Sequence, residues 1–499
     1  MPFRAQAGKP LPLFLIIKDA DKFPILPERL VLRYGPTPSV EKQLEIPLNR
    51  KEVLSKAFFT ETFRLPAHLI DRPGRWYFRP VLFWKKESAT PQQQTVVDSY
   101  PDKAPGLLIV NFYKENLPKF PGWLLGDLHT HSNYTSDQIE FGAPLAQMQE
   151  AARTVGLDFF AVTDHSYDLD DAEDDYLKND PALPKWKRFW EETERLNRSN
   201  PKGPTIIPGE EVSCGNYRNN NFHLLILNDR RFHPGAGDGA EKLFANRPTQ
   251  SLPEVLQAAS PNALAVAAHP GEQPPFSQRF LLNRGDWHTH DCLHPRLNAL
   301  QILNNNSPKA LKRGLSLWKA ALLAGRRIGI MAGSDAHGNF NIYRQVEIPL
   351  ISMLRHRDHL FGLYRTAVYS ESNQPDDIVE NLRRLHAVIS NGPLLIFSHP
   401  DYPVAVGETL PRQALAALKI EGISSGEFGT FKSVRLFWGS YRRQEEVEVP
   451  CPVPPNSYRL EIPLPEIPPI ANYLRARAET ANGEIEYFSL TNPIWIANE

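Results

Sequence analysis

Cysteine is scarce in this sequence of 499 residues. The chain has three cysteines, Cys214, Cys292 and Cys451, which lie far apart and form no C-x-x-C pair. An odd number of widely spaced cysteines argues against a disulfide framework and against a thiolate zinc site. This usage fits a reducing compartment, and we expect Cys214 to be a small core residue.

Long apolar runs and an excess of one charge are also missing. No stretch approaches the roughly 20 apolar residues of a membrane span, and the N-terminal segment lacks the pattern of a signal peptide. We therefore expect a cytoplasmic protein with no membrane partner. Lysine plus arginine (56) nearly balances aspartate plus glutamate (57), so there is no broad basic field for nucleic-acid binding. Nucleic acid is disfavoured as a partner, and the oligomeric state is left open.

Core-forming residues are abundant, and their patterning changes along the chain. Hydrophobic residues make up 41% of the sequence, and its length predicts more than one domain. Residues 1–120 and 401–499 alternate short β-rich runs with turn residues, a pattern typical of β-sandwich-like domains. Within 121–400 apolar strands alternate with helical periodicity, for example the helix PLAQMQEAARTVG after the strand LLGDL. This middle segment predicts an α/β domain with a parallel sheet or a barrel.

Residue types that bind metals recur where apolar strands of the middle segment end. The H-x-H pair that follows WLLGDL places two imidazoles on one face of an extended segment. The candidate ligands are His129, His131, Asp137, His165, Glu211, His223, His269, Asp335 and His337.

Imidazole nitrogen together with carboxylate oxygen favours Zn, Mn or Fe over Mg or Ca. These candidates exceed the four ligands of a closed structural zinc site, so they indicate more than one ion and open coordination positions. Open positions favour catalysis by metal-activated water.

The order of these motifs resembles the polymerase-and-histidinol-phosphatase (PHP) family of metal-dependent hydrolases. Over about residues 122–345 the chain has D-L-H-T-H-S with a following S-D, V-T-D-H, P-G-x-E, a strand histidine, A-H-P and G-S-D-A-H. After GSDAHGNF, the segments RTAVYS, NLRRLHAVI and SNGPLL resemble the carbaryl-hydrolase-type branch of that family. The resemblance implies a distorted (β/α) barrel over 121–400, flanked by the two β-sandwich-like domains.

The resemblance also implies how two or three divalent transition-metal ions would be held. The first ion takes His129, His131 and Asp335, and Glu211 bridges two ions. Choosing Glu211 over Glu210 depends on aligning G-x-E with residues 209–211. The second ion is completed by His223 and His269, and a third by Asp137, His165 and His337.

Other polar residues have weaker positions in the sequence. Asn304, Asn305 and Arg344 are candidates for substrate contact, with local capping or solvation as the alternative. The acidic run at 168–176 predicts a solvated segment. Histidines in loops or beyond the last motif are not expected to bind metal: His233, His288, His290, His294 and His399.

The predicted function is hydrolysis of a small-molecule ester by metal-activated water, with a phosphoester favoured. Carbamate, amide or carboxylic ester hydrolysis at the same site is the alternative. A nuclease is disfavoured by the balanced charge, and a non-catalytic binding protein by the intact ligand set. Asp335 or a nearby histidine is expected to shuttle protons, and His337 or His269 to protonate the leaving group.

Overall fold

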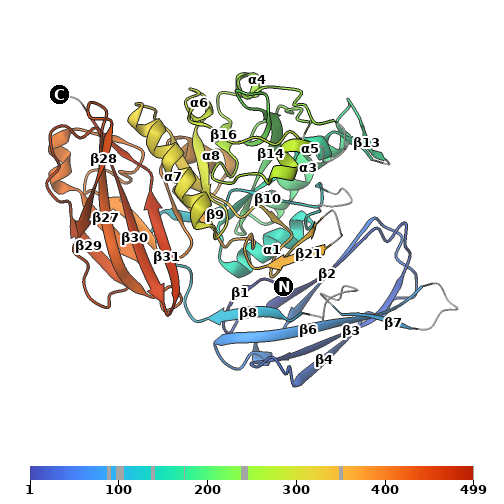
Figure 1. Ribbon diagram of the computed structural model, residues 1–499. Helices are drawn as coiled ribbons and strands as arrows, with labels where there is room; N and C mark the ends of the chain where they lie inside the picture. The colour runs from blue at the N-terminus through green and yellow to red at the C-terminus, as the bar shows by residue number, and fades with distance from the viewer. Residues whose placement is uncertain are drawn as a thin grey trace. The chain divides into compact units, whose positions relative to one another are not determined.

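The chain forms two compact units in the computed structural model (Figure 1). The structure describes residues 1–86, 92–96, 106–135, 141–173, 175–237, 245–347 and 352–497. The first unit comprises Met1–Asn116, Ala146–Gly156 and Asn339–Leu360, and the second comprises Leu117–Leu145, Leu157–Gly338 and Phe361–Glu499. No helix of the described residues is long and apolar enough to cross a membrane.

The first unit is built mainly from strands. A sheet in the order β1-β8-β6-β3-β4, with β7 paired to β6, accompanies the antiparallel pairs β2–β5 and β20–β21. Its core contains the buried rings of Trp76, Phe78 and Phe112. Its strands are β1 (Arg4–Gln6), β2 (Leu11–Lys18), β3 (Leu26–Gly35), β4 (Lys42–Pro47), β5 (Phe58–Leu65), β6 (Gly74–Lys85), β7 (Gln93–Val96), β8 (Leu108–Tyr113), β20 (Tyr343–Glu347) and β21 (Ser352–His356). The helix α1 (Leu145–Val155) belongs to this unit from Ala146 onward.

The second unit holds one large sheet and the candidate site. The sheet runs in the order β18-β17-β16-β15-β14-β11-β9-β22-β23-β31-β30-β27-β28. Its first nine strands along this path are β18 (Gly329–Ala332), β17 (Ala299–Leu303), β16 (Leu264–Ala267), β15 (Asn221–Leu227), β14 (Thr205–Gly215), β11 (Phe159–His165), β9 (Trp123–Asp127), β22 (Arg365–Tyr369) and β23 (Ala387–Ser390). The remaining strands on it are β31 (Ile485–Thr491), β30 (Tyr473–Asn482), β27 (Thr430–Ser440) and β28 (Glu445–Cys451).

Smaller elements complete the second unit. Three small sheets accompany the large one: β10 (Thr130–His131) with β19 (Ala336–His337), β12 (Asp171–Ala172) with β13 (Asp175–Asn179), and β24 (Leu394–Ser398) with β26 (Lys419–Ile423) and β29 (Arg459–Pro463). The large sheet itself also includes β32 (Ile494–Ile496), which pairs with β30, and β25 (Thr409–Leu410), which pairs with β32. The α-helices are α2 (Ser166–Leu169), α3 (Pro184–Ser199), α4 (Leu252–Ala258), α5 (Phe276–Leu281), α6 (Thr289–Cys292), α7 (Pro308–Leu323) and α8 (Pro375–Arg383).

The predicted (β/α) barrel is wrong. About 40% of the residues lie in strands and 18% in helices, and the strands form large sheets. A β/α barrel needs parallel strands with a helix between each successive pair. In the described part of the chain β9 pairs with β11, and β16 with β17, in parallel, but β14–β15, β15–β16, β9–β22 and β22–β23 are antiparallel.

The hairpin between β14 and β15 explains part of this error. Only residues 216–220 separate Gly215 from Asn221, and a parallel crossover needs a dozen residues or more. The local sequence pattern predicted both strands but not their direction relative to each other. The sheet also continues from β23 into β31, so strands after residue 400 share it. The boundaries proposed near residues 120 and 400, and the two β-sandwich-like domains, stay predictions.

Apolar packing on the sheet holds the site strands in place. One buried cluster joins Phe159 of β11, Ile207 of β14 and Leu225 of β15 with Ile378 and Leu382 of α8. On the C-terminal side, α7 packs against β27 and β28 (Figure 1). The strands that carry His165, Glu211 and His223 therefore share one apolar core.

Candidate metal centre

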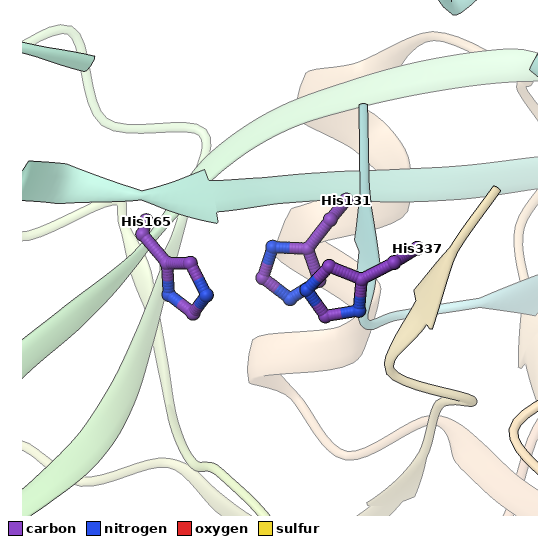
Figure 2. Close-up of side chains that lie close together, drawn as sticks. All are labelled: His131, His165 and His337. Carbon is purple, nitrogen blue, oxygen red and sulfur yellow. The ribbon is translucent and has the colours of Figure 1, made fainter. Parts of the chain in front are cut away.

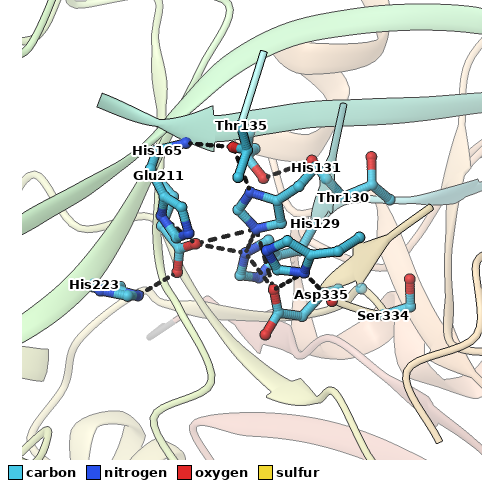
Figure 3. A network of polar contacts seen from close by, with 12 residues as sticks. His129, Thr130, His131, Thr135, His165, Glu211, His223, Ser334 and Asp335 are labelled. Atoms are coloured by element: carbon cyan, nitrogen blue, oxygen red, sulfur yellow. Dashed lines mark hydrogen bonds and ion pairs between the residues drawn. The ribbon is translucent and has the colours of Figure 1, made fainter. Parts of the chain in front are cut away.

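Eight of the nine predicted ligands come together in one cluster. Figure 3 shows His129, His131, His165, Glu211, His223 and Asp335 among them. They form three overlapping groups whose donor atoms lie within 4.8 Å of one another. The groups are His129, His131, Glu211 and Asp335; Glu211, His223 and His269; and His131, His165 and His337. Each group could hold a metal ion. The ninth candidate, Asp137, lies outside the described residues.

Glu211 joins two of these groups through its two carboxylate oxygens. Its Oε2 lies 3.2 Å from Nε2 of both His129 and His131. Its Oε1 lies 2.7 Å from Nδ1 of His223 and 3.3 Å from Nε2 of His269. One carboxylate therefore faces two separate sets of imidazoles, as expected of a residue shared by two ions.

Glu210 points away from the cluster, because successive side chains of a strand face opposite sides. Its Oε1 accepts a hydrogen bond from Trp186 Nε1 at 2.8 Å, and its Oε2 accepts one from the backbone N–H of His233 at 3.0 Å. Burial raises the pKa of Glu210 to about 8. The structure thus brings Glu211 into the cluster and leaves Glu210 in a separate buried environment. Both residues lie within β14 and not at its end.

The third group is set by the short pair β10–β19. His131 and His337 are register partners in this pair, and their rings stack with centroids 4.0 Å apart. His165, the last residue of β11, lies beside them, with its ring centroid 4.6 Å from that of His131 (Figure 2). The group therefore depends on pairing between segments about 200 residues apart.

Asp127 fixes the turns that carry His129 and Asp335. It accepts hydrogen bonds from the backbone N–H of Ser334 at 2.8 Å and of His129 at 3.3 Å, and from Ser334 Oγ at 2.5 Å. Gly333 allows these turns to approach closely, since a Cβ there would lie 2.6 Å from the His129 nitrogen. Burial raises the pKa of Asp127 to about 6.

Gln301 orients the His129 ring. Its Nε2 donates to the Gly333 carbonyl at 2.9 Å and its Oε1 accepts from the His269 backbone N–H at 3.1 Å, which fixes the amide orientation. Oε1 must then accept from His129 Nδ1, at 2.9 Å. The opposite nitrogen of His129, Nε2, is thereby directed at the carboxylates. Such partners of ligand histidines fix the tautomer in metal sites.

Asp164 supports the turn after His131. It accepts from the Ser132 backbone N–H at 2.7 Å, from Ser132 Oγ at 2.6 Å and from the Thr135 backbone N–H at 3.1 Å. These supporting roles of Asp127, Gln301 and Asp164 were not predicted. The sequence feature that could have indicated such a role is a polar residue inside an apolar strand, such as Gln301 in ALQIL.

The charges of the cluster suit a cation. Although burial opposes ionisation, the imidazoles of His223 and His129 hold the pKa of Glu211 well below its usual range, and His129 and His131 do the same for Asp335. The carboxylates raise the pKa of His131 well above its usual value despite burial. His129 Nε2 and His131 Nε2 lie only 3.2 Å apart. Converging imidazole nitrogens and ionised carboxylates are a donor set that fits transition-metal ions.

Three side chains of the cluster are partly exposed to solvent. The side chains of Asp335, His269 and His337 are 24%, 20% and 17% exposed, whereas those of His129 and Glu211 are at most 1% exposed. The three more exposed residues are those predicted to transfer protons.

Other predicted positions lie elsewhere. His233 pairs with Asp229 at 2.9 Å, and the ring centroid of His288 lies 5.1 Å from that of Tyr217. Among the described residues, none of the histidines excluded on sequence grounds joins the three groups: His233, His288, His290, His294 and His399. Cys214 is buried, as predicted, and burial raises the pKa of its thiol.

The structure describes the contacts of two of the three residues suggested for substrate contact. Asn304 and Asn305 both donate to Glu272 Oε1, the first at 2.7 Å. The side chain of Arg344 lies outside the described residues. Arg284, which the sequence did not indicate, is close to the cluster, with its Nη1 2.5 Å from His223 Nε2.

The prediction of a solvated acidic run is wrong for three of its residues. Asp168, Asp170 and Asp171 are buried. Lys185 Nζ lies 3.0 Å from Asp171 Oδ2, and Asn179 donates to Asp170 at 2.7 Å. Pairing therefore replaces solvation for the carboxylates of Asp170 and Asp171.

A scan against protein-family models finds no match to this chain, and a search of curated proteins finds no significant relative.

Proposed function

We propose that this chain is a PHP-type metal-dependent hydrolase that binds two or three divalent transition-metal ions, Zn, Mn or Fe, and cleaves a small-molecule ester, with phosphoesters favoured. One observation carries the proposal: three buried donor groups share His131 and Glu211. A closed structural site needs one group of about four ligands, whereas adjoining groups with shared members suit several ions acting together. The order of the sequence motifs supports the family assignment.

Each group would hold one ion. His129, His131 and Asp335 would bind the first, with Glu211 shared between it and a second ion at His223 and His269. His165 and His337 would bind a third, to which the sequence adds Asp137. When bound, such ions lower the pKa of water and polarise the bond to be cleaved.

The residues of the chain orient these ligands and move protons. Gln301 holds the Nδ1 proton of His129, so Nε2 faces the site. Asp335, at the exposed side of the cluster, would accept a proton from the attacking water. His269 or His337 would donate a proton to the leaving oxygen, which lets it depart as an alcohol.

Metal content and turnover of matched variants test the proposal. The variant His129→Ala/His131→Ala removes the H-T-H pair in the cluster, and His288→Ala/His290→Ala removes the H-T-H pair outside it. Purified proteins would be reconstituted with Zn or Mn, analysed for bound metal, and assayed with bis- and mono-p-nitrophenyl phosphate and p-nitrophenyl acetate.

We expect two or three equivalents of metal and ester hydrolysis in the wild type and the control, and loss of both in the cluster variant. A wild-type protein that binds no metal after reconstitution would refute the metal site. A metal-loaded protein that is silent on every ester would refute the hydrolase assignment.

A further inference from the structure

The helix α5 (Phe276–Leu281) presents three large apolar side chains to solvent. Phe276, Phe280 and Leu281 are 83%, 77% and 61% exposed. The two phenyl rings are one helical turn apart and nearly parallel, with centroids 6.5 Å apart and planes inclined by 12°. Side chains of this kind are normally buried on folding. An exposed apolar patch, unlike a single exposed residue, is typical of a binding surface.

Polar contacts hold α5 in place, so its apolar side chains are not needed to anchor it. Arg279 Nε donates to the Pro274 carbonyl at 2.9 Å, and Arg279 Nη2 donates to Asp286 Oδ1 at 3.0 Å. Asn246 Nδ2 donates to the Leu281 carbonyl at 3.2 Å. These bonds fix the backbone of the segment, while the two phenyl rings remain exposed.

Both ends of the segment that carries α5 adjoin the metal-ligand cluster. The segment begins directly after His269, and the backbone N–H of Glu272 donates to the His269 carbonyl at 3.0 Å. It ends against β15, where Asn221 Nδ2 donates to the Leu282 carbonyl at 3.1 Å. Asn221 and His223 are alternate residues of one strand, so their side chains leave the same face of it. The helix is therefore bracketed by the two segments that carry His223 and His269, which are members of one donor group.

The size and charge of this surface indicate an apolar part of a small molecule as its occupant. Residues 273–283 (QPPFSQRFLLN) include one charged side chain, Arg279, which is paired with Asp286 at 2.9 Å. A phenylalanine side chain offers roughly 200 Å², so the three exposed side chains present about 400 Å² in total. A stable protein interface buries about 800 Å² on each partner. The surface is too small to hold a second protein by itself and large enough for an aromatic ring or an alkyl chain.

We propose that α5 binds an apolar group of the substrate, and that the site therefore takes hydrophobic esters, with an aromatic ring or an alkyl chain beside the group that is cleaved. This rests on the proposed hydrolase function and specifies its substrate class. Phe276 and Phe280 contact the face or the edge of the bound ring, since aromatic groups prefer offset or edge-to-face packing. Leu281 extends this surface toward β15, against which the next residue, Leu282, is bonded.

Two phosphonates that differ only in their apolar group test this proposal without requiring turnover. Phenylphosphonate and methylphosphonate carry the same anionic head, and their binding to the metal-loaded full chain would be measured by calorimetry. The variant Phe276→Ser/Phe280→Ser removes both rings, Phe276→Leu/Phe280→Leu keeps apolar side chains, and Phe23→Ser removes a phenylalanine that is 73% exposed in the first unit. Bound metal would be measured by elemental analysis for every protein.

We expect the wild type to bind phenylphosphonate about 10-fold more tightly than methylphosphonate, the ratio that corresponds to removing about 60 Å² of apolar surface from water. Phe276→Ser/Phe280→Ser should reduce this ratio to below about threefold by loss of that surface, with metal content and methylphosphonate binding at wild-type values. The leucine variant should keep most of the preference, and Phe23→Ser should match the wild type.

A phenyl preference that is absent from the wild type, or that survives loss of both rings, overturns the proposal. Loss of metal or of methylphosphonate binding in the serine variant also overturns it, because α5 would then support the cluster. A dimeric wild type that becomes monomeric in the serine variant, as measured by sedimentation, assigns this surface to a second copy of the chain instead. If the wild type shows the phenyl preference but hydrolyses no ester, the hydrolase proposal fails while the apolar binding site stands.

Discussion

Replacing Gln301 with leucine should weaken metal binding without touching any proposed ligand. The Gln301 amide contacts four groups in the interior: His129 Nδ1 at 2.9 Å, the His269 backbone N–H at 3.1 Å, the Gly333 carbonyl at 2.9 Å and, more distantly, Asn304 Oδ1 at 3.5 Å. Leucine has a similar volume but offers none of these hydrogen bonds. The His129 ring would lose the acceptor that fixes its tautomer.

The magnitude follows from the groups left behind. A buried polar group without a partner costs about 1 to 3 kcal/mol, so leaving the three closest groups without a partner gives a destabilisation of about 3 to 9 kcal/mol. Loss of a partner that orients a ligand histidine lowers metal affinity by roughly 10- to 100-fold. Gln301→Glu keeps an oxygen acceptor for His129 and His269, and should therefore retain more metal affinity than Gln301→Leu.

Two assays separate these effects. Competition with a chromophoric chelator at pH 7 reports metal affinity, and urea unfolding of the metal-free protein reports stability. Gln257→Leu, an exposed glutamine on α4, is the matched control and should match the wild type in both. Wild-type metal affinity in a folded Gln301→Leu protein would refute the idea that this amide sets the His129 tautomer.

Three further perturbations have defined outcomes. Glu211→Gln should lose at least one metal equivalent in elemental analysis, whereas Glu210→Gln should retain all of them, because Glu210 faces away from the cluster; equal metal content in the two variants would contradict the bridging role. Burial raises the pKa of Asp229, but hydrogen bonds from His233 and Ser260 outweigh this effect and lower the pKa to about 2. The ionised carboxylate therefore contributes about 2 kcal/mol to the free energy of unfolding above about pH 4. This contribution is lost as the pH falls from about 4 to about 2. Urea unfolding should accordingly show Asp229→Asn less stable than the wild type at pH 7, with a difference that shrinks toward pH 2; a constant difference would show that ionisation plays no part. Chelation by EDTA should lower both Tm and esterase activity, and Zn or Mn should restore them; a Tm unaffected by chelation would contradict metal binding in the folded state.

The positions of the candidate ligands were predictable because they depend on local pattern. His129 and His131 alternate on an extended segment after β9, and His165 ends β11. Residue type and position near a strand thus indicated eight side chains that the structure brings together. The direction of the strands was not predictable from that local pattern. The five-residue connection between β14 and β15 was nevertheless too short for a crossover between parallel strands.

The residues that orient the ligands could not be located in the same way, because their partners are distant in sequence. Gln301 is 172 positions from His129, and Ser334 is 207 positions from Asp127. Sequence shows that a polar side chain lies in an apolar strand, and burial then requires a partner, but only the pairing of strands determines which partner is reached. Arg284 is the extreme case: it follows no strand and matches no motif, and its position beside His223 depends on backbone bonds between its loop and the turn before β15. The types of the candidate ligands are therefore encoded locally, whereas their orientation depends on the topology of the whole sheet.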